Sequence, residues 1–231
     1  PWAWLALAPL LIVVTFSLKR TAWIMLFAGL ALFATYFVRT TQLNMNRAIG
    51  ALAIGLLIIG ATVFSFPKLH TQFTDTLDIF SADFETADVA TSHRLSLWKT
   101  GLSIAEAHPI NGIGPRGYRT IYREFAAADD FWIARGNEGQ THPHLMALEV
   151  LVETGVVGLI GYALCLAMLA VRSWRQRDTN PTSSVLLLVA FVAWFPLNAH
   201  LAFYGSYWAN IAWITISLGC SSVATMSQET A

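Results

Sequence analysis

The chain has 231 residues, of which 55% are hydrophobic and only 12% carry a charge, and its formal net charge is zero. An ordinary soluble domain has roughly a quarter of its residues charged, so this composition favours an integral membrane protein over a soluble one. The balanced charge gives no overall field that would attract nucleic acid or an acidic partner.

Six apolar runs are each long enough to cross a hydrocarbon core as a helix. They are apolar on all faces, which indicates contact with lipid or deep burial. The runs are Trp2–Leu18, Thr21–Val38, Ala48–Phe66, Thr154–Val171, Ser183–Ala202 and Ser206–Thr225. The sequence therefore predicts an all-α, polytopic integral membrane protein with about six transmembrane helices in this chain.

These runs also predict the division of the chain into parts. We expect three transmembrane helices in residues 1–66, a loop domain with short helices in residues 67–145, three further transmembrane helices in residues 146–226, and a polar tail in residues 227–231. The chain opens at Pro1 inside an apolar run, without the basic segment that begins a signal peptide. We therefore expect it to be the C-terminal part of a longer protein. Cys165 and Cys220 lie in apolar runs and form no CxxC pair, so we expect small core residues.

Cations in the short loops predict the orientation of the spans, because loops rich in Lys and Arg normally stay cytoplasmic. The cations in question are Arg39 and Arg47 at the second connection, and Arg172, Arg175 and Arg177 at the fourth. The long polar loop then faces outward, and so does the pair Lys19-Arg20. That pair breaks the usual bias. It either snorkels to lipid phosphates or serves the same compartment as the loop.

The outer loop is predicted to be mostly helical. Ser92 is a suitable N-cap for a helix with one stripe made of Arg94, Leu95, Trp98, Leu102 and Ile104. His108-Pro109 ends that helix, and a Gly-rich turn follows. A second short amphipathic helix is predicted over Tyr118–Ala128.

The segment after the loop carries two histidines and two glutamates. His144 is predicted to lie just before the fourth membrane helix. Glu149 and Glu153 fall in the first turns of that helix, where carboxylates suit the positive end of the helix dipole.

Several common types of active site do not fit the sequence. His142-x-His144 lacks further ligands at a recognisable spacing and there is no HExxH, so no metal site is expected. There is no GxSxG elbow of a serine hydrolase. The pair Gly112-Ile-Gly114 follows a predicted helix and not a strand, so it is not a dinucleotide fingerprint. We expect no cofactor.

The arginines and histidines of the loop are the stronger candidates, because guanidinium groups bind phosphates through two hydrogen bonds. Arg94 shares a stripe with Trp98, and an arginine on an apolar face needs an anionic partner. His142 and His144 border a membrane helix, and each is either a capping residue or a general base. The remaining loop arginines, Arg116, Arg119, Arg123 and Arg135, are interpreted mainly as a solvated face paired with acidic residues.

Four segments together resemble the O-antigen ligase and O-antigen polymerase superfamily. They are Lys19-Arg20-Thr-Ala-Trp23, Ser92-His-Arg94-Leu-Ser-Leu-Trp98, His108-Pro-Ile-Asn-Gly-Ile-Gly-Pro115, and His144 followed eleven positions later by Gly155. Two positions depart from the superfamily pattern. Leu145 stands where an amide usually follows the histidine, which leaves His142 open as the acting residue, and Arg116 replaces a small residue.

The resemblance implies a membrane-embedded glycosyltransferase of the GT-C-like kind, most like the O-antigen ligase. Such an enzyme takes a glycan from undecaprenyl diphosphate and transfers it to the lipid A-core, on the periplasmic face of the bacterial inner membrane, without a metal ion. It implies that Arg20 and Arg94, with Arg116 in addition, bind the diphosphate. It further implies that His144, or His142 as second choice, orients or deprotonates the acceptor hydroxyl.

Three alternatives stay open. An O-antigen polymerase or a protein O-oligosaccharyltransferase would come from the same superfamily. A lipid or polysaccharide transporter would belong to a different class, and Pro196, Asn198 and His200 could then line a cleft at one end of the fifth run. For the transferase, we expect the head groups of Arg20, Arg94 and His144 to converge within about 15 Å, given the short reach of charge in salt.

Overall fold

The computed structural model describes residues 29, 60, 64–134, 139–198 and 203–229. The regular elements within these residues are all helical, which confirms the predicted all-α class for this part of the chain. In chain order they are α4 (Pro67–Leu77), the 3-10 helix η1 (Asp78–Phe80), α5 (Phe84–Ala90), α6 (Arg94–Ala107), α7 (Tyr118–Phe125), α8 (Phe131–Ala134), α9 (Met146–Gln176), α10 (Pro181–Ala193) and α11 (Ser206–Glu229). The first predicted span and Arg20 lie outside the described residues, as do the second and third predicted spans apart from residues 29, 60 and 64–66.

The chain divides into two compact units, Pro1–Ala90 and Thr91–Ala231. In the described part of the first unit, Asp83 caps α5: its Oδ2 accepts hydrogen bonds from the hydroxyl of Thr86 at 2.6 Å and from the amide of Thr86 at 2.9 Å. These two bonds lower the pKa of the Asp83 carboxyl below its usual value. A short polar side chain therefore fixes where this helix begins.

The second unit begins with α6, whose start differs from the predicted one. His93, and not Ser92, is the N-cap, and it makes no capping hydrogen bond through its side chain. Ser92 and His93 both have a left-handed backbone, with φ of 61° and 58°, so the hydroxyl of Ser92 is not at the capping position. The helix ends at Ala107 with His108 as its C-cap, where the sequence predicted the end.

The buried face of α6 also differs from the predicted stripe. Its buried residues are Leu97, Thr100, Gly101, Ile104 and Ala105. Leu102, which was assigned to the stripe, is 50% exposed. The buried face of α6 is therefore rotated around the helix axis relative to the predicted stripe. It begins at Leu97 and continues through residues spaced by three and four, whereas the predicted stripe began at Arg94.

Helix α7 packs with α6 and the first part of α9 in a small core. It stops at Phe125, three residues before the predicted end, because Ala126 is extended. The Tyr118 hydroxyl donates to the carbonyl of Leu97 at 2.9 Å, and burial raises the pKa of Tyr118 above its ordinary value. The buried residues of this core are Leu97, Ile104, Ala105, Tyr118, Tyr122, Leu148 and Val152.

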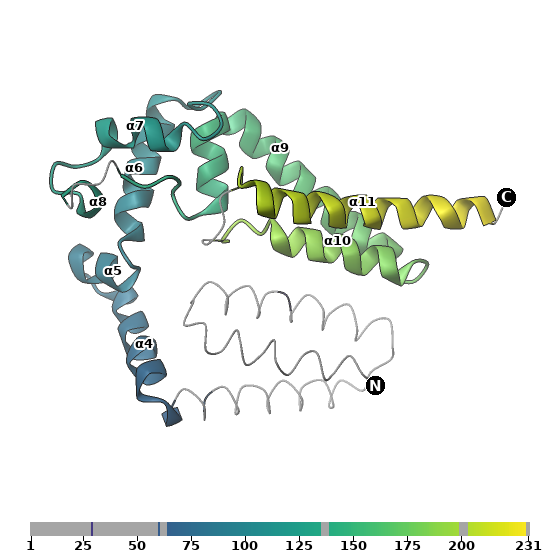
Figure 1. Cartoon of the computed structure of the whole chain (residues 1–231), viewed down its shortest axis with the longest axis horizontal. Coiled ribbons are helices and arrows are strands. Elements are labelled where there is room, and N and C mark those ends of the chain that lie inside the picture. The colour runs from purple at the N-terminus through teal and green to yellow at the C-terminus, as the bar shows by residue number, and fades with distance from the viewer. Residues whose placement is uncertain (1–28, 30–59, 61–63, 135–138, 199–202, 230–231) are drawn as a thin grey trace. The chain divides into compact units, whose positions relative to one another are not determined.

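Helix α9 is broken at Gly155, whose φ of 66° and ψ of −168° are not helical. Figure 1 shows the axis of α9 turning there. The first part, Met146–Thr154, packs on α6 and α7. The second part packs along α10. The part before the break therefore contacts both cores, with Leu148 and Val152 in the loop core and Met146 and Val150 in the core of the apolar helices, whereas the part after it packs along α10.

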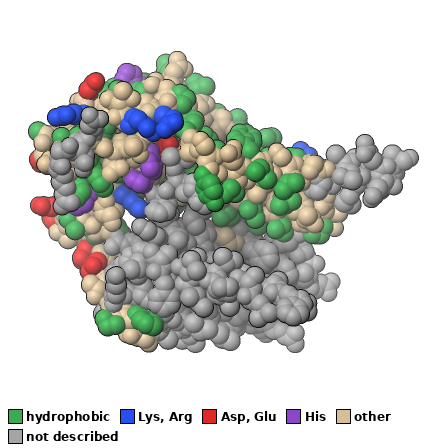
Figure 2. Space-filling model, in the orientation of Figure 1, with side chains coloured by type: hydrophobic (Ala, Val, Ile, Leu, Met, Phe, Trp, Pro, Cys, Tyr) green, Lys and Arg blue, Asp and Glu red, His purple; other side chains and the backbone are tan. Residues whose placement is uncertain are grey.

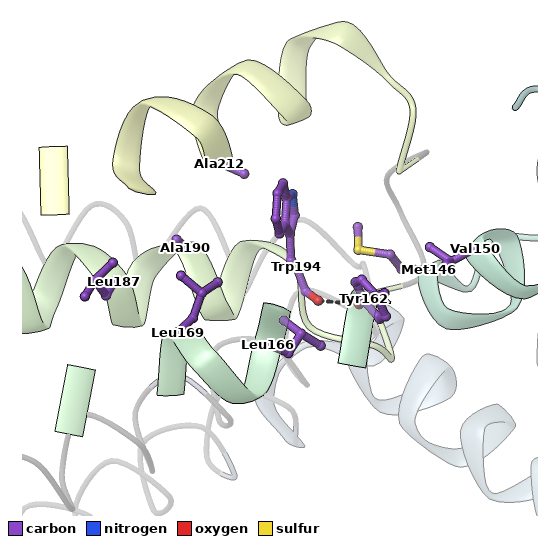
Figure 3. Close-up of a cluster of buried hydrophobic side chains, with 9 residues drawn as sticks. All are labelled: Met146, Val150, Tyr162, Leu166, Leu169, Leu187, Ala190, Trp194 and Ala212. Carbon is purple, nitrogen blue, oxygen red and sulfur yellow. Dashed lines mark hydrogen bonds between the residues drawn. The ribbon is translucent and has the colours of Figure 1, made fainter. Parts of the chain in front are cut away.

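A second core joins α9, α10 and α11 (Figure 3). The hydroxyl of Tyr162 donates to the carbonyl of Trp194 at the end of α10. Ser173 and Ser184 exchange hydrogen bonds of 2.8 and 2.7 Å through their hydroxyl and carbonyl groups, an arrangement typical of small polar residues between membrane helices. The core consists of Met146, Val150, Tyr162, Leu166, Leu169, Leu187, Ala190, Trp194 and Ala212.

Within the described residues, α9 is the one helix long and apolar enough to cross a membrane. The part after Gly155 is about 31 Å long at 1.5 Å per residue, close to the thickness of a hydrocarbon core. Helix α10 ends at Ala193, well before the predicted Ala202, and is too short to qualify. Cys165 and Cys220 are free and pack against the second core, as expected.

Candidate functional site

Trp98 joins the two segments that carry the candidate catalytic residues. Its indole Nε1 donates to the carbonyl of Pro143 at 3.0 Å, and Pro143 lies between the two candidate histidines. Arg94 is one helical turn before Trp98, about 6 Å along the axis of α6. The structure thus brings Trp98, in the first half of α6, into contact with the histidine segment.

The two histidines lie against each other. Their ring centroids are 4.1 Å apart at an interplanar angle of 51°. The Nδ1 atom of His142 is 2.9 Å from the hydroxyl of Thr141, and its Nε2 atom is buried. His144 is half-buried and lies one residue before the N-cap of α9, Leu145, as the sequence predicted.

Helix α8 holds the other end of this arrangement. The His93 ring stacks on Phe131 with centroids 3.4 Å apart, and the indole Nε1 of Trp132 donates to the His93 carbonyl at 3.0 Å. Asp130 in turn accepts from the amide of Trp132 at 2.9 Å. The residue directly before Arg94 is therefore fixed by aromatic contacts.

Backbone strain is concentrated at the candidate residues. Four described residues other than glycine have a positive φ: Ser92 at 61°, His93 at 58°, Arg116 at 61° and His144 at 51°. The left-handed region is unfavourable for such side chains. Strain of this kind clusters at functional sites, where the surrounding structure holds it in place. Two of the four are site candidates themselves, and the other two directly precede Arg94.

The Gly-rich turn at residues 108–117 is hydrogen-bonded to the break in α9, and we call these two segments the turn–helix joint. The amides of Ile113 and Gly114 donate to the carbonyls of Val152 and Glu153 at 3.1 and 2.9 Å, and the amides of Val156 and Val157 donate to the carbonyls of Pro109 and Ile110 at 2.8 and 3.4 Å. A broken helix leaves amide and carbonyl groups without partners inside the helix. The turn supplies those partners.

Two glycines make this close approach possible. A Cβ atom on Gly155 would lie 2.0 Å from the carbonyl oxygen of Ile110, and a Cβ atom on Gly112 would lie 2.5 Å from the backbone of Glu153. Both residues also have a positive φ, which glycine adopts without steric cost. The glycines that carried the family resemblance are therefore the contact points of the joint.

Glu153 lies inside the joint, where it does more than the predicted interaction with the helix dipole. Its side chain is 1% exposed. Its Oε2 accepts from the amide of Arg116 and its Oε1 accepts from the amide of Tyr118 at 3.4 Å. Besides any effect on the helix dipole, the carboxylate thus binds a distant segment. The available signal was a glutamate inside an apolar run, where a buried charge needs donors.

The start of α9 is held by the segment that follows α10. The amides of Met146 and Ala147 donate to the carbonyls of Asn198 and Pro196 at 3.0 and 3.2 Å. The carboxylate of Glu149, 2% exposed, accepts from the amide of Phe203 at 2.9 Å. Pro196 and Asn198 therefore cap the helix next to His144, while His200 lies outside the described residues.

The loop arginines that follow α6 lie at the surface where the structure describes them. Arg116, Arg119 and Arg123 are exposed, and their guanidinium groups form no ion pair with a carboxylate of the described residues. Arg135 lies outside the described residues. Figure 2 shows basic and histidine side chains over the α6–α8 end of the second unit, and mainly hydrophobic ones over α9–α11. In the described ranges, no group of three His, Cys, Asp or Glu side chains is arranged to hold a metal ion.

The site candidates therefore fall into three groups. Arg94, His142 and His144 belong to one arrangement joined through Trp98. Arg116 is joined to the same first part of α9 through Glu153. Arg20 lies outside the described residues, so its convergence with the others stays a prediction.

The chain is 26% identical over 191 residues to the exopolysaccharide production protein ExoQ of Rhizobium meliloti (strain 1021). The match covers 73% of this chain and 43% of ExoQ, so the chain spans less than half of that relative. No solved structure matches the chain.

A family profile gives the broader match. The sequence profile of the O-antigen ligase family Wzy_C matches residues 5–163. This range contains the Lys19-Arg20 pair, the start of α6, the turn–helix joint and both candidate histidines. The chain belongs to the O-antigen ligase family.

Proposed function

We propose that the chain is the catalytic part of a membrane-embedded glycosyltransferase acting on a lipid-diphosphate-linked glycan. In the ligase reaction, the donor is undecaprenyl diphosphate carrying the O-antigen, and the acceptor is the lipid A-core. The reaction takes place on the periplasmic face of the inner membrane, during lipopolysaccharide biosynthesis. It requires neither a metal ion nor a nucleotide sugar.

In the proposed reaction, the bond between the anomeric carbon of the glycan and the phosphate oxygen breaks. Its electron pair stays on undecaprenyl diphosphate. The acceptor hydroxyl oxygen forms the new glycosidic bond, and its proton passes to the imidazole of His144, or of His142. Arg20, Arg94 and Arg116 stabilise the charge that grows on the diphosphate, because preorganised donors act most strongly where charge develops.

One observation carries this proposal. The hydrogen bond from Trp98 to Pro143 holds the helix of Arg94 against the segment of the two histidines. A cationic group for the leaving diphosphate and a base for the acceptor then lie on neighbouring, rigid elements. Such placement is what proximity and general-base catalysis require.

The chain is proposed to contain six spans, with residues 1–66 and 146–226 in the inner membrane and residues 67–145 in the periplasm. The length of α9 after its break supports this assignment, since it fits one crossing of the hydrocarbon core.

The polymerase reaction is the second candidate, and one specific observation favours it. The curated relative is described as an exopolysaccharide production protein, and making a polysaccharide requires that repeats be joined to one another. In that reaction the donor chemistry is the same, and a second undecaprenyl-diphosphate-linked repeat replaces the lipid A-core as acceptor.

The test is a transfer assay with the purified protein in lipid vesicles. Vesicles receive the undecaprenyl-diphosphate-linked glycan with either lipid A-core or a second lipid-linked repeat, and products are identified by mass spectrometry. We expect a new glycosidic bond with one acceptor and no product from Arg94→Ala or Arg20→Lys, while Arg172→Gln, at the far end of α9, stays active. Unchanged transfer by either of the first two variants would refute the role of that arginine. Movement of the lipid across vesicles without any covalent product would support a transporter.

A further inference from the structure

We propose that Glu153 is a positioning residue for Arg116. Its buried carboxylate holds the 108–117 turn on the broken end of α9, and the turn in turn presents Arg116 to the donor diphosphate. This inference rests on the proposed function, in which Arg116 binds the diphosphate.

The carboxylate of Glu153 binds backbone groups of a distant segment. Both oxygens of Glu153 accept backbone amides, one from Arg116 and one from Tyr118. The side chain is 1% exposed, so water does not replace a lost partner. Amides two residues apart that point at one anion form a concave binding site for negative charge. In this protein, a carboxylate from a distant helix fills that site.

The backbone of Arg116 is strained. Its φ of 61° is unfavourable for a residue with a side chain, and the residue takes the place of a small one in the superfamily pattern. The amide of Arg116 points at Glu153 in this conformation. Removal of the carboxylate removes a hydrogen bond that stabilises the strained backbone of Arg116. We then expect the turn to relax and the side chain of Arg116 to change direction.

The joint includes the helical segment that follows His144. Glu153 lies in the same short helical segment that begins two residues after His144. A turn fixed to this segment keeps a constant position relative to the histidine. The guanidinium of Arg116 is exposed and has no ion pair with a described carboxylate, so it is available to an incoming phosphate.

The chemistry predicts a difference between conservative substitutions. Glu153→Asp keeps two acceptor oxygens and the charge. Glu153→Gln keeps the size, but it replaces one acceptor by an NH2 group that faces an amide donor and leaves that buried donor without an acceptor. The aspartate variant should therefore be closer to wild type than the glutamine variant, although glutamine is the closer match in length.

The kinetic test is a double-mutant cycle with the full protein in vesicles, in which KM for undecaprenyl-diphosphate-linked glycan is measured. We expect Glu153→Gln and Arg116→Gln each to raise the donor KM by on the order of tenfold to a hundredfold, as for a hydrogen bond to a charged group. Adding Glu153→Gln to Arg116→Gln should change the KM by less than about twofold, because both act through one contact. Glu124→Gln, which removes an exposed charge from α7, should leave the KM unchanged. Two effects that multiply in the double variant would overturn the proposal.

A second readout does not depend on activity. Spin labels are attached to cysteines at Thr120 in α7 and Arg175 in α9, in a protein whose Cys165 and Cys220 are alanine. Electron–electron distance measurements should give a narrow distribution for wild type and Glu124→Gln, and a broader one for Glu153→Gln, with Glu153→Asp between them. An unchanged distribution in Glu153→Gln would contradict the positioning role. Absence of transfer by the wild-type protein would instead contradict the proposed function and leave the distance result intact.

Discussion

Trp98 shows at the scale of one residue how this protein builds a site from distant segments. Its indole donates to the carbonyl between two histidines, and its ring packs against the core of the loop. The sequence indicated Trp98 as a member of a helical stripe and of a family pattern. Its partner, 45 positions away, could not be predicted from local spacing.

We predict that Trp98→Phe lowers transfer more than it lowers stability. Phenylalanine keeps most of the packing but removes the indole donor, whose net contribution to stability is about 1 kcal/mol. The histidine segment then loses its link to α6, so kcat should fall several-fold while the unfolding temperature changes little. Trp174→Phe, on the exposed far part of α9, is the matched control. An equal effect of both variants on kcat would contradict the account.

The two histidines are predicted to differ in their contributions. If His144 takes the acceptor proton, His144→Ala should lower kcat by ~10²–10⁴-fold, the usual range for a general base. His142→Ala should have a smaller effect, through loss of the ring contact that supports His144. Initial rates at saturating donor and acceptor decide between them. The reverse order of effects would make His142 the base.

Other single residues show where sequence reasoning stops. The Ser92 hydroxyl suited an N-cap, but a left-handed backbone at Ser92 and His93 moved the start of α6 by one residue. Local sequence indicated only an interaction of Glu153 with the helix dipole. Its two amide donors lie 37 and 35 positions earlier in the chain, too far away to be recognised from local spacing. Contacts between such distant residues depend on the tertiary fold, and they produce no periodic pattern in the sequence.

At the scale of elements, the apolar runs predicted helices well where packing and lipid both favour them. The run Thr154–Val171 falls within α9, and Ser206–Thr225 within α11. The run Ser183–Ala202 failed at its end, because the residue before a proline avoids helical conformation and Pro196 lies inside it. The predicted end of this run was based on apolar composition and did not include the effect of Pro196.

The break in α9 gives the clearest prediction at this scale. Gly155→Ala puts a Cβ atom 2.0 Å from the carbonyl oxygen of Ile110 and forces alanine into a left-handed conformation. Backbone strain of this type costs on the order of 1–3 kcal/mol, and the clash adds to it. We expect a clear fall in the thermal unfolding temperature in detergent, together with loss of transfer.

Gly161→Ala is the control for that experiment. Gly161 lies further along α9, and a Cβ atom there meets nothing within 4 Å. Alanine is also the better helix former, so its unfolding temperature should match or exceed that of wild type. A similar destabilisation by both substitutions would show that the joint at Gly155 has no special role.

At the scale of the whole molecule, the chain combines apolar helices with a polar, mostly helical loop. The charge pattern predicts that the loop faces the periplasm and that the connection between α9 and α10 faces the cytoplasm. Single cysteines at Ala127 and Thr179, in a protein without native cysteines, test this. A membrane-impermeant reagent added to intact cells stripped of their outer membrane should label Ala127→Cys only. Labelling of Thr179→Cys from outside would reverse the orientation.

We propose that cationic groups from distant segments meet beside an imidazole to hold a lipid diphosphate. The most direct measurement is an experimental structure of the protein in a lipid nanodisc with undecaprenyl-diphosphate-linked glycan bound. We predict phosphoryl oxygens about 2.7–2.9 Å from the guanidinium nitrogens of Arg20 and Arg94, with the imidazole of His144 facing the anomeric carbon. A structure with Arg20 on the opposite side of the membrane from Arg94 and His144 would contradict the account.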